Sequence, residues 1–333
     1  MEKVSVVVPC LNERKNIRNC IESLINNNYP NELLEILVID GMSEDGTIEI
    51  IKELCKENSN VHLIINKDRI TPVALNLGVL NAKGDFIMIA GGHAWFPHNY
   101  ISKLVNYLLN SDAAVVGGAL ETKVNKINVK SLAITKVLSN KFGVGNSYFR
   151  IGASDSLRVD TVPFGLYKRS VFQNVGYYNE KLIRNHDIEL SKRILEKGLK
   201  IYLLPDVVCY YFARDNYKDL AKNNFQNGLW NVLTVYITKS LRSLSIRHYI
   251  PLLFILALLL PVVIAVIAFP PFILMTLAVL FLYVLSLLFI SFKLTKKPEI
   301  LFNVIWSFIV IHFSYGFGSL VGSLEIHYLL KQK

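Results

Sequence analysis

The sequence predicts an α/β domain with a mostly parallel, Rossmann-like central sheet, followed by a surface helix and a C-terminal transmembrane helical region. Apolar runs alternate with helical segments over the first 120 residues. These runs contain no regular polar alternation, which is typical of parallel strands buried on both faces. The chain ends in three apolar blocks, each long enough for the roughly 20 helical residues that cross a bilayer.

The N-terminal alternation is specific enough to place individual elements. Strands are expected at 4–9, 35–40, 61–65, 85–90 and 113–118. Helices are expected near 14–27, 46–57, 71–82 and 98–109, and Thr71-Pro72 is a favourable helix start. Such βαβα alternation indicates right-handed crossovers between neighbouring parallel strands.

The middle of the chain is less regular. Residues 121–160 are rich in Asn, Ser, Gly and Lys, and we expect a long functional loop there. A helix near 187–197 and strands near 200–204 and 207–212 follow. We place the catalytic domain at 1–214.

The C-terminal third is expected to associate with a membrane. Residues 215–248 mix aromatic and basic residues, as in an interfacial amphipathic helix, and 249–333 form the transmembrane region. Basic residues flank the first two blocks, so the positive-inside rule predicts a hairpin with both ends in the cytoplasm. The third block contains polar residues and glycines; it could cross, re-enter or pack inside the bundle, and we expect a crossing. The candidate spans are 249–269, 271–292 and 300–322.

Composition and the N-terminus restrict the compartment and the partners. The net charge of +10 favours attraction to anionic lipid or to phosphorylated substrates. The chain shows no stripe of basic and aromatic residues, so we expect no nucleic acid as a partner. The four cysteines form no CxxC pair. Met1-Glu2-Lys3 leads directly into a strand, so we expect no signal peptide and a cytoplasmic catalytic domain. Together with the apolar blocks, this predicts a multi-pass protein of the cell membrane.

Two strands near the N-terminus each end in a polar turn. The first is followed by Pro9-Cys10-Leu11-Asn12-Glu13, and the second by the turn from Asp40 to Thr47, which reads DGMSEDGT. Ligands bind at the carboxyl ends of such strands. The chain contains neither GxGxxG nor GxxxxGK[ST], which argues against a dinucleotide fingerprint and a P-loop. Turn and helix-capping chemistry is the alternative explanation for Asp40 and Asp45.

These motifs, in this order, resemble those of family 2 glycosyltransferases, inverting enzymes of the GT-A fold that use nucleotide-diphospho-sugars. The resemblance covers roughly residues 3–240, and the apolar tail is similar to the succinoglycan-type membrane branch. It implies that base and ribose contact Pro9, Asn12, Glu13 and Asp40. Arg69 would face the phosphates, with a solvated loop charge as the alternative.

The family's metal-binding D-x-D turn is altered here. The strand 85–90 is followed by Gly91, Gly92 and His93, so the first Asp is missing. The resemblance implies that both glycines line the nucleotide-sugar site and that His93 ligates Mn²⁺ or Mg²⁺. An imidazole favours Mn²⁺, since Mg²⁺ prefers oxygen ligands. A purely structural histidine is the alternative.

The segment around Asp187 resembles the family's [EQ]-D-x-E-L motif, which implies that this carboxylate is the general base. A helix N-terminal carboxylate is the alternative, and both roles are compatible. Glu189 is expected to be a structural or capping partner. The resemblance places further residues on the acceptor side, namely Phe164, Gly165, His186, Gln226 and Trp230. Leu229 stands where processive synthases carry an Arg, which argues against processivity.

We therefore expect a membrane-anchored inverting glycosyltransferase. It would move a sugar from a nucleotide-diphospho-sugar, with a UDP-sugar favoured, to a lipid-linked saccharide in polysaccharide or glycoconjugate biosynthesis. One alternative is a polyprenyl-phosphate glycosyltransferase, and another is a degenerate, non-catalytic scaffold or sugar-nucleotide-binding protein. Donor sugar, acceptor, linkage and oligomeric state stay open at this point.

Overall fold

The computed structural model describes residues 2–124, 127–212 and 216–326. Internal contacts divide the chain into two compact units. The first comprises Met1–Glu121 and Tyr148–Phe212, and the second comprises Thr122–Ser147 and Ala213–Lys333. This grouping assigns 122–147 differently from the boundaries expected from the sequence.

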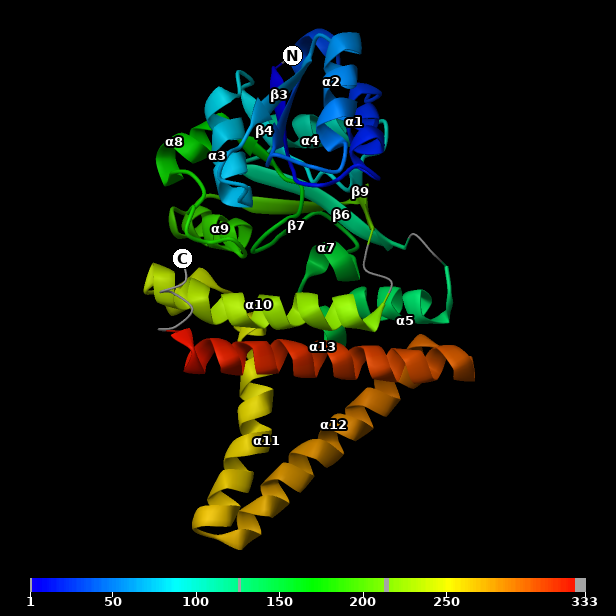
Figure 1. The fold of residues 1–333 in the computed structure, drawn as a ribbon, viewed down its shortest axis with the longest axis vertical. Coiled ribbons are helices and arrows are strands. Elements are labelled where there is room, and N and C mark those ends of the chain that lie inside the picture. The colour runs from blue at the N-terminus through cyan, green and yellow to red at the C-terminus, as the bar shows by residue number, and fades with distance from the viewer. Residues whose placement is uncertain (1, 125–126, 213–215, 327–333) are drawn as a thin grey trace. The chain divides into compact units, whose positions relative to one another are not determined.

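The first unit is built on one mixed sheet with the strand order β3-β2-β1-β4-β8-β6-β9-β5, and β7 pairs with β9 (Figure 1). The strands are β1 Val4–Cys10, β2 Leu34–Asp40, β3 Val61–Ile65, β4 Phe86–Ile89, β5 Ala94–Trp95, β6 Val115–Lys123, β7 Leu157–Arg158, β8 Leu166–Lys168 and β9 Ile201–Phe212. Strands β1 to β4 pair in parallel, as predicted. The other half pairs antiparallel, with β8 between β4 and β6 and with β9 beside β5 and β7. Three of these antiparallel strands have only two or three residues, too few for a periodic signal.

Helices cover both faces of this sheet because its central strands are apolar on both sides. All seven residues of β2 are buried. One apolar cluster joins alternate residues of β1 to α1, α2 and α4, and the other joins Val7 on the opposite face of β1 to α3, α8 and α9. These helices are α1 Ile17–Ile25, α2 Thr47–Glu57, α3 Thr71–Asn81, α4 Tyr100–Leu109, α8 Arg169–Val175 and α9 His186–Glu196. The short helix α7 Tyr148–Ile151 also belongs to this unit.

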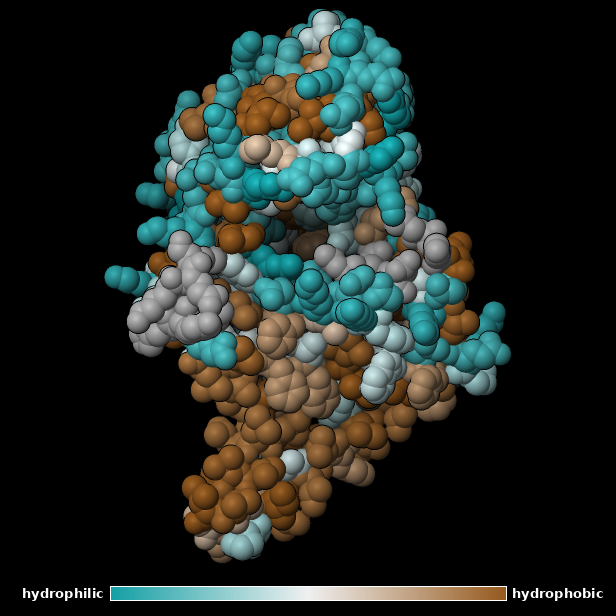
Figure 2. Space-filling model, viewed as in Figure 1, coloured by the Kyte–Doolittle hydropathy of each residue, from teal (hydrophilic) through white to brown (hydrophobic). Residues whose placement is uncertain are grey.

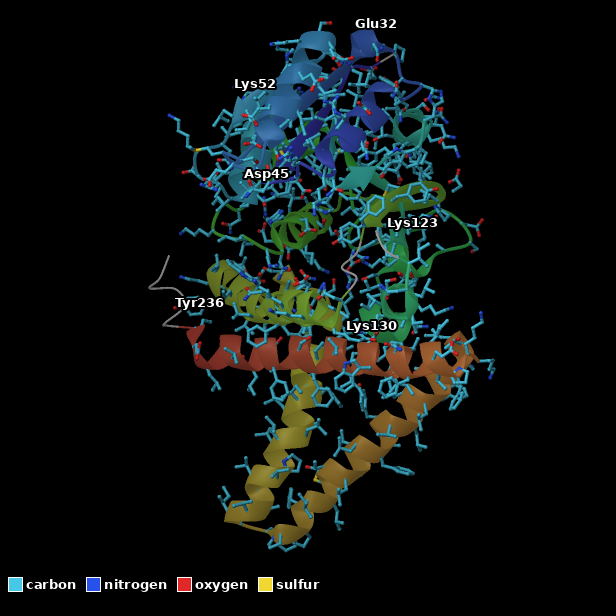
Figure 3. The ribbon with its side chains drawn as sticks, turned by 45° about the vertical axis from the view of Figure 1, so that its right-hand side comes forward. Glu32, Asp45, Lys52, Lys123, Lys130 and Tyr236 are labelled. Atoms are coloured by element: carbon cyan, nitrogen blue, oxygen red, sulfur yellow. The ribbon has the colours of Figure 1, made fainter. Side chains whose placement is uncertain are left out.

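The second unit consists of helices. They are α5 Val129–Leu138, α6 Lys141–Val144, α10 Tyr217–Thr238, α11 Ile250–Ile267, α12 Ile273–Leu294 and α13 Pro298–Leu324. Within this unit α13 runs alongside α10 and packs against α5, whereas α11 and α12 form a hairpin that projects away from α13 (Figures 1 and 3). The surface of the hairpin is almost uniformly apolar (Figure 2). By length and composition α11, α12 and α13 are each able to cross a membrane.

Helices α5 and α6 occupy part of the segment for which the sequence predicted an irregular loop. Asn128 caps α5 by accepting a hydrogen bond from the backbone N–H of Ser131, whose hydroxyl accepts from the Asn128 N–H. The apolar side of α5, with Ile134 and Val137, packs against Phe308 of α13. The local sequence is rich in polar residues and therefore did not predict this helix. Its apolar side packs against a helix that lies far along the chain.

Small residues allow α10 and α13 to pack closely. A Cβ atom on Gly318 of α13 would overlap the backbone carbonyl of Phe225 in α10. A Cβ atom on Gly228 would in turn overlap the carbonyl of Tyr315. The hydroxyl of Ser319 donates to the Gly228 carbonyl at 3.1 Å. Small residues that bring two backbones together are typical of helix pairs at or in membranes.

Candidate active site

A cleft of about 400 Å³ in the first unit brings together most of the site residues expected from the sequence. It lies at the carboxyl ends of β1 and β4, where ligands of α/β proteins bind. The expected residues that line it are Pro9, Glu13, Arg69, Gly91, Gly92, His93, Phe164, Gly165, His186 and Asp187.

Glu13 and His93 form a hydrogen-bonded pair in this cleft. Nδ1 of His93 lies 3.0 Å from Oε1 of Glu13, and the side-chain amide of Asn16 donates to Oε2 at 3.0 Å. Burial opposes ionisation of Glu13, but the hydrogen bonds from His93 and Asn16 outweigh it and hold the pKa of Glu13 below its usual value. The ionised carboxylate of Glu13 accepts a hydrogen bond from Nδ1–H, and in this tautomer of the neutral imidazole Nε2 of His93 carries the lone pair.

These residues fit a divalent cation in a limited way. No group of three or more His, Cys, Asp and Glu side chains that could hold a metal occurs in the part of the chain that the structure describes. His93 would therefore be a single protein ligand through Nε2, oriented by the carboxylate behind it. Carboxylate–histidine pairs of this kind are the usual support of metal-binding imidazoles. Phosphate oxygens and water would have to supply the other ligands.

Phe164 explains why the first position of the D-x-D turn is a glycine. A Cβ atom on Gly91 would lie only 2.8 Å from Cε1 of the Phe164 ring. Phe164 itself has a positive φ of 46° and is held by the hydroxyl of Tyr100, which donates to its carbonyl at 3.3 Å. An aspartate at position 91 would therefore have to displace this ring.

Asp40 and Asn12 do not line the cleft but join the two N-terminal turns. Asp40 is fully buried and accepts hydrogen bonds from the backbone N–H and the hydroxyl of Ser43, at 2.7 and 2.6 Å. The same hydroxyl accepts from the N–H of Asn12 at 2.8 Å, and Asn12 Oδ1 accepts from the N–H of Glu44 at 3.0 Å. Contact of Asp40 and Asn12 with a nucleotide stays a prediction.

Arg69 lines the cleft while forming a partly exposed ion pair. Its guanidinium lies 3.0 Å from Oε1 of Glu44. Exposed pairs of this type contribute roughly 0–1 kcal/mol, so a phosphate could displace Glu44 at little cost. The positive φ of Arg69, 59°, fits its position in a turn.

Asp187 lies in the first turn of α9, exposed at its end of the cleft. Two buried tyrosines, Tyr167 and Tyr178, line the cleft with it. Burial first, and then the charge of Asp187, raise the pKa of Tyr167 above its usual value, so its hydroxyl stays protonated. Tyr178 is hydrogen-bonded to Tyr167, and the protonated phenol of Tyr167 is available as a hydrogen-bond donor to Asp187 or to a substrate.

The segment that leads into α9 is held by Asn76 of α3, which the sequence did not single out. Its side-chain amide donates to the backbone carbonyl of Tyr178 at 3.0 Å and accepts from the Tyr178 N–H at 2.9 Å. Glu189 is bonded to the guanidinium of Arg193 at 2.7 and 2.9 Å, in the structural role expected for it. His186 lines the cleft with its ring 5.8 Å from that of Tyr178, and its buried Nδ1 has no hydrogen-bond partner among the described residues.

Gln226 and Trp230 belong to α10 of the second unit. Trp230 is buried with Leu229 and Leu233. An acceptor-side role for Gln226 and Trp230 stays a prediction.

A mixed Rossmann-like sheet with a cleft at the carboxyl ends of its parallel strands is the architecture of the GT-A class. The model of the family described as "Glycosyl transferase family 2" matches residues 5–176, and the chain belongs to this family. The chain is similar to "Dolichyl N-acetyl-alpha-D-glucosaminyl phosphate 3-beta-D-2,3-diacetamido-2,3-dideoxy-beta-D-glucuronosyltransferase" of Methanococcus voltae. The two are 31% identical over 238 residues, which is 68% of this chain and 72% of the relative.

One further relative and one solved structure are similar to this chain. The succinoglycan biosynthesis protein ExoA of Rhizobium meliloti is 31% identical over 211 residues, 63% of this chain and 63% of that protein. The structure of the mannosyltransferase PcManGT from Pyrobaculum calidifontis, in complex with GDP-Man and Mn²⁺, has a TM-score of 0.58. It is 15% identical and the match covers 97% of this chain and 86% of that one, so it supports the fold.

Proposed function

We propose that this enzyme is a membrane-anchored inverting glycosyltransferase that moves one sugar from a UDP-sugar to a lipid-linked saccharide. The observation that carries the proposal is the single cleft that contains the Glu13–His93 pair, Arg69 and Asp187. It offers a cation and an imidazole for a diphosphate and a carboxylate for an acceptor hydroxyl. The relatives from Methanococcus voltae and Rhizobium meliloti support an acceptor that carries a saccharide.

In this proposal Asp187 takes the proton of the acceptor hydroxyl as its oxygen bonds to the anomeric carbon. The bond between that carbon and the diphosphate oxygen breaks on the opposite face, so the configuration inverts. A carboxylate suits this step because the hydroxyl becomes acidic only as the new bond forms. Tyr167 and Tyr178 would restrict the orientation of Asp187 and of the sugar.

The leaving diphosphate needs positive charge. Arg69 supplies one cationic group once it leaves Glu44. A divalent cation on Nε2 of His93 would neutralise the developing charge on the leaving group. The Mn²⁺ of the Pyrobaculum calidifontis complex supports a divalent cation in this class, and the imidazole favours Mn²⁺ over Mg²⁺ here.

For the membrane we propose that α11 and α12 insert as a hairpin. Lys293 lies in the last turn of α12, and Arg242 and Arg247 precede α11. Both ends of the hairpin are therefore basic, and we place them on the cytoplasmic side. Because α13 runs along α10, which carries Lys218 and Lys222, we place α13 in the interface instead of in the third crossing expected from its length. Reporter fusions after residues 270 and 326 test this topology. The proposal expects opposite sides for the two fusions, and the same side for both would contradict it.

A polyprenyl-phosphate glycosyltransferase is the second candidate, since its acceptor is also membrane-bound. Its acceptor is an ionised phosphate, which needs no general base. Asp187→Asn with full activity would favour that reaction.

A non-catalytic sugar-nucleotide-binding protein is the third candidate, motivated by the missing D-x-D aspartate. The steric role of Phe164 at position 91 gives another reason for that absence. Nucleotide binding without turnover of any donor would favour this candidate.

Calorimetry on the detergent-solubilised protein tests the donor side first. UDP and GDP are titrated separately, with and without Mn²⁺, into wild type and His93→Ala. We expect UDP binding that Mn²⁺ strengthens, and we expect His93→Ala to lose that gain. If UDP binds equally well with and without Mn²⁺ and in His93→Ala, the metal role of His93 is wrong. If neither UDP nor GDP binds, the proposed function is overturned.

A further inference from the structure

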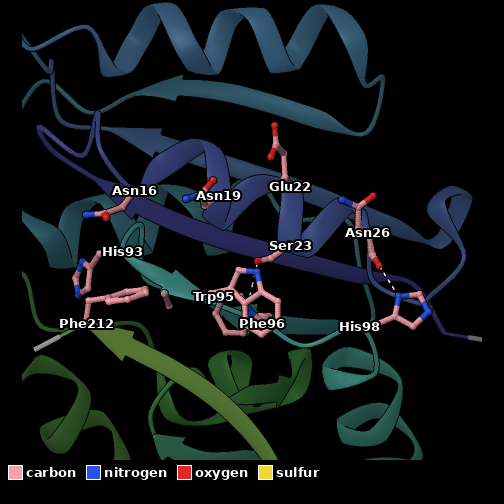
Figure 4. A pocket seen from close by; sticks show the side chains of 11 residues that line it. Asn16, Asn19, Glu22, Ser23, Asn26, His93, Trp95, Phe96, His98 and Phe212 are labelled. Atoms are coloured by element: carbon pink, nitrogen blue, oxygen red, sulfur yellow. Dashed lines mark hydrogen bonds between the residues drawn. The ribbon is translucent and has the colours of Figure 1, made fainter. Parts of the chain in front are cut away.

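A second cavity in the first unit lies between α1 and the segment that contains β5 (Figure 4). Its volume is about 430 Å³, within the roughly 300–1,000 Å³ typical of small-molecule sites. Residues of α1, of the 93–98 segment and of the end of β9 line it. His93 lines both this cavity and the cleft described above, so the two meet at that imidazole.

One wall of this cavity is a row of carboxamides. Asn16, Asn19 and Asn26 are separated by three and seven positions and therefore lie on one face of α1 and its flanks. Within the described part of the chain, the side chains of Asn19 and Asn26 form no hydrogen bond, while Asn16 is bonded to Glu13. Each free amide offers two donors and one acceptor oxygen.

Aromatic rings form the facing wall. Trp95 is 42% exposed although it lies in a strand, and its ring is 5.2 Å from that of Tyr210 behind it. The rings of Trp95 and Phe212 lie beneath α1 (Figure 4). An exposed ring supported from behind suits an apolar face of a ligand, and the Trp95 indole N–H adds a donor.

The charge of this cavity selects among ligands. No Lys or Arg lines it, although the protein carries a net charge of +10, and its one carboxylate, Glu22, is paired with Arg18 outside the lining at 3.6 Å. A phosphate or nucleotide would find no Lys or Arg among the lining residues here, whereas the cleft with Arg69 provides one. A neutral ligand with one apolar face and many hydroxyls matches both walls. Sugars have this chemistry, because their ring C–H groups cover aromatic rings and their hydroxyls exchange hydrogen bonds with amides.

We propose that this second cavity, between Asn19 of α1 and Trp95 of β5, is a subsite for neutral sugar residues of the acceptor glycan. The role as acceptor subsite rests on the proposed glycosyltransferase function, since the cavity meets the donor cleft at His93. The saccharide would lie with its ring over Trp95 and its hydroxyls on Asn19 and Asn26. The part of the acceptor that does not react would thus contribute binding and orientation.

Saturation-transfer NMR on the full chain in a detergent without sugar headgroups tests this proposal. Maltose, cellobiose, lactose and chitobiose are offered one at a time at millimolar concentration. We expect at least one of them to bind, and binding to fall at least tenfold in Trp95→Ala and in the Asn19→Ala/Asn26→Ala double variant. Trp306→Ala is the matched control, because Trp306 is a similarly exposed tryptophan (46%) on α13, and it should bind as wild type does.

UDP and GDP binding, measured on the same samples, separates this proposal from the proposed function. A variant that still binds nucleotide is folded, so loss of disaccharide binding in it supports the subsite. Wild-type protein that binds nucleotide but none of the four disaccharides overturns the subsite, as does undiminished binding in both cavity variants. Disaccharide binding sensitive to Trp95 in a protein that binds neither nucleotide supports a saccharide site and overturns the glycosyltransferase role.

Discussion

Nδ1 of His93 lies 3.0 Å from Oε1 of Glu13, so the residue expected to bind metal is held by a residue expected to bind nucleotide. Asn16 occupies the other carboxylate oxygen at 3.0 Å. The carboxylate therefore fixes the ring and the tautomer of His93 and directs Nε2 away from the pair. This relationship gives Glu13 a positioning role that its place in the Pro9–Glu13 turn did not predict.

Replacement of Glu13 by Gln tests this role. An amide in place of the carboxylate weakens the hold on the imidazole, and losses of such partners typically reduce metal affinity by about 10- to 100-fold. We expect the Mn²⁺ concentration needed for UDP binding, measured by calorimetry, to rise by a factor of that size. Glu49→Gln, on the exposed side of α2, is the control. Unchanged Mn²⁺ dependence in the Glu13 variant would show that the pair is only structural.

Asp187→Asn should lower kcat by roughly 10²- to 10⁴-fold, the usual contribution of a general base. Donor binding should persist, because the amide keeps the size and the polarity of the side chain. Initial rates with a saturating donor, together with calorimetric UDP affinity, measure the two effects separately. Asp206→Asn is the control, since Asp206 is exposed and paired with Lys103. An equal loss of donor affinity and rate would assign Asp187 to binding instead of proton transfer.

Glu189→Ala should destabilise the first unit without a comparable effect on the chemical step. Glu189 is buried and bonded to Arg193, whose guanidinium also donates to the carbonyls of Val175 and Tyr177 at 2.7 Å. Removal of one partner of a fully buried pair costs roughly 3–5 kcal/mol, and we expect a smaller cost here because the Arg193 side chain is 28% exposed. The midpoint of thermal unfolding should fall, and Glu196→Ala on the exposed side of α9 should leave it in place. A fall in kcat with unchanged stability would instead give Glu189 a direct role.

The sequence predicted the parallel half of the sheet and the residues at its strand ends, because buried strands leave continuous apolar runs and their turns carry polar motifs. It placed strands near β6 and β9 but did not predict the antiparallel pairing of this half, since β5, β7 and β8, which complete it, are too short for periodicity. The contact of Phe164 with Gly91 joins positions 73 residues apart and leaves no local pattern. Tyr178 and Asn76 likewise meet through tertiary structure, at a separation of 102 residues.

The thiols of the first unit provide a test of the buried core. Burial, followed by the charge of Glu13, raises the pKa of Cys20 to about 12, and burial raises the pKa of Cys209 to about 12. Burial and Asp40 also raise the pKa of Cys10. Thiolates react and thiols do not, so iodoacetamide at pH 8 should label the half-buried Cys55 first. Peptide mass spectrometry measures the order of labelling, with Cys55→Ser as the control; fast labelling of Cys20 would contradict the structure.

The same thiols predict the alkaline limit of stability. A folded thiol with a raised pKa keeps its proton while the unfolded thiol, with its ordinary value of 9.0, releases it. The unfolding free energy should therefore be unaffected below pH 9 and fall as the pH rises from 9 towards 12. Urea midpoints at pH 8 and pH 10.5 measure this fall. A Cys20→Ala variant should show a shallower decrease, and an identical decrease would contradict the assignment to this thiol.

Gly318→Val tests the packing of α10 against α13. A side chain at position 318 would overlap the backbone carbonyl of Phe225, which cannot rotate away, and overpacking of this kind costs roughly 1–3 kcal/mol. We expect a lower unfolding midpoint in detergent for Gly318→Val and no change for Ser323→Val, since Ser323 is exposed on the same helix. An unchanged midpoint for Gly318→Val would show that α13 is separate from α10 and free to cross the membrane. A lowered midpoint ties α13 to a helix that carries Lys218 and Lys222, whose charges favour the lipid headgroups and so hold both helices at the interface.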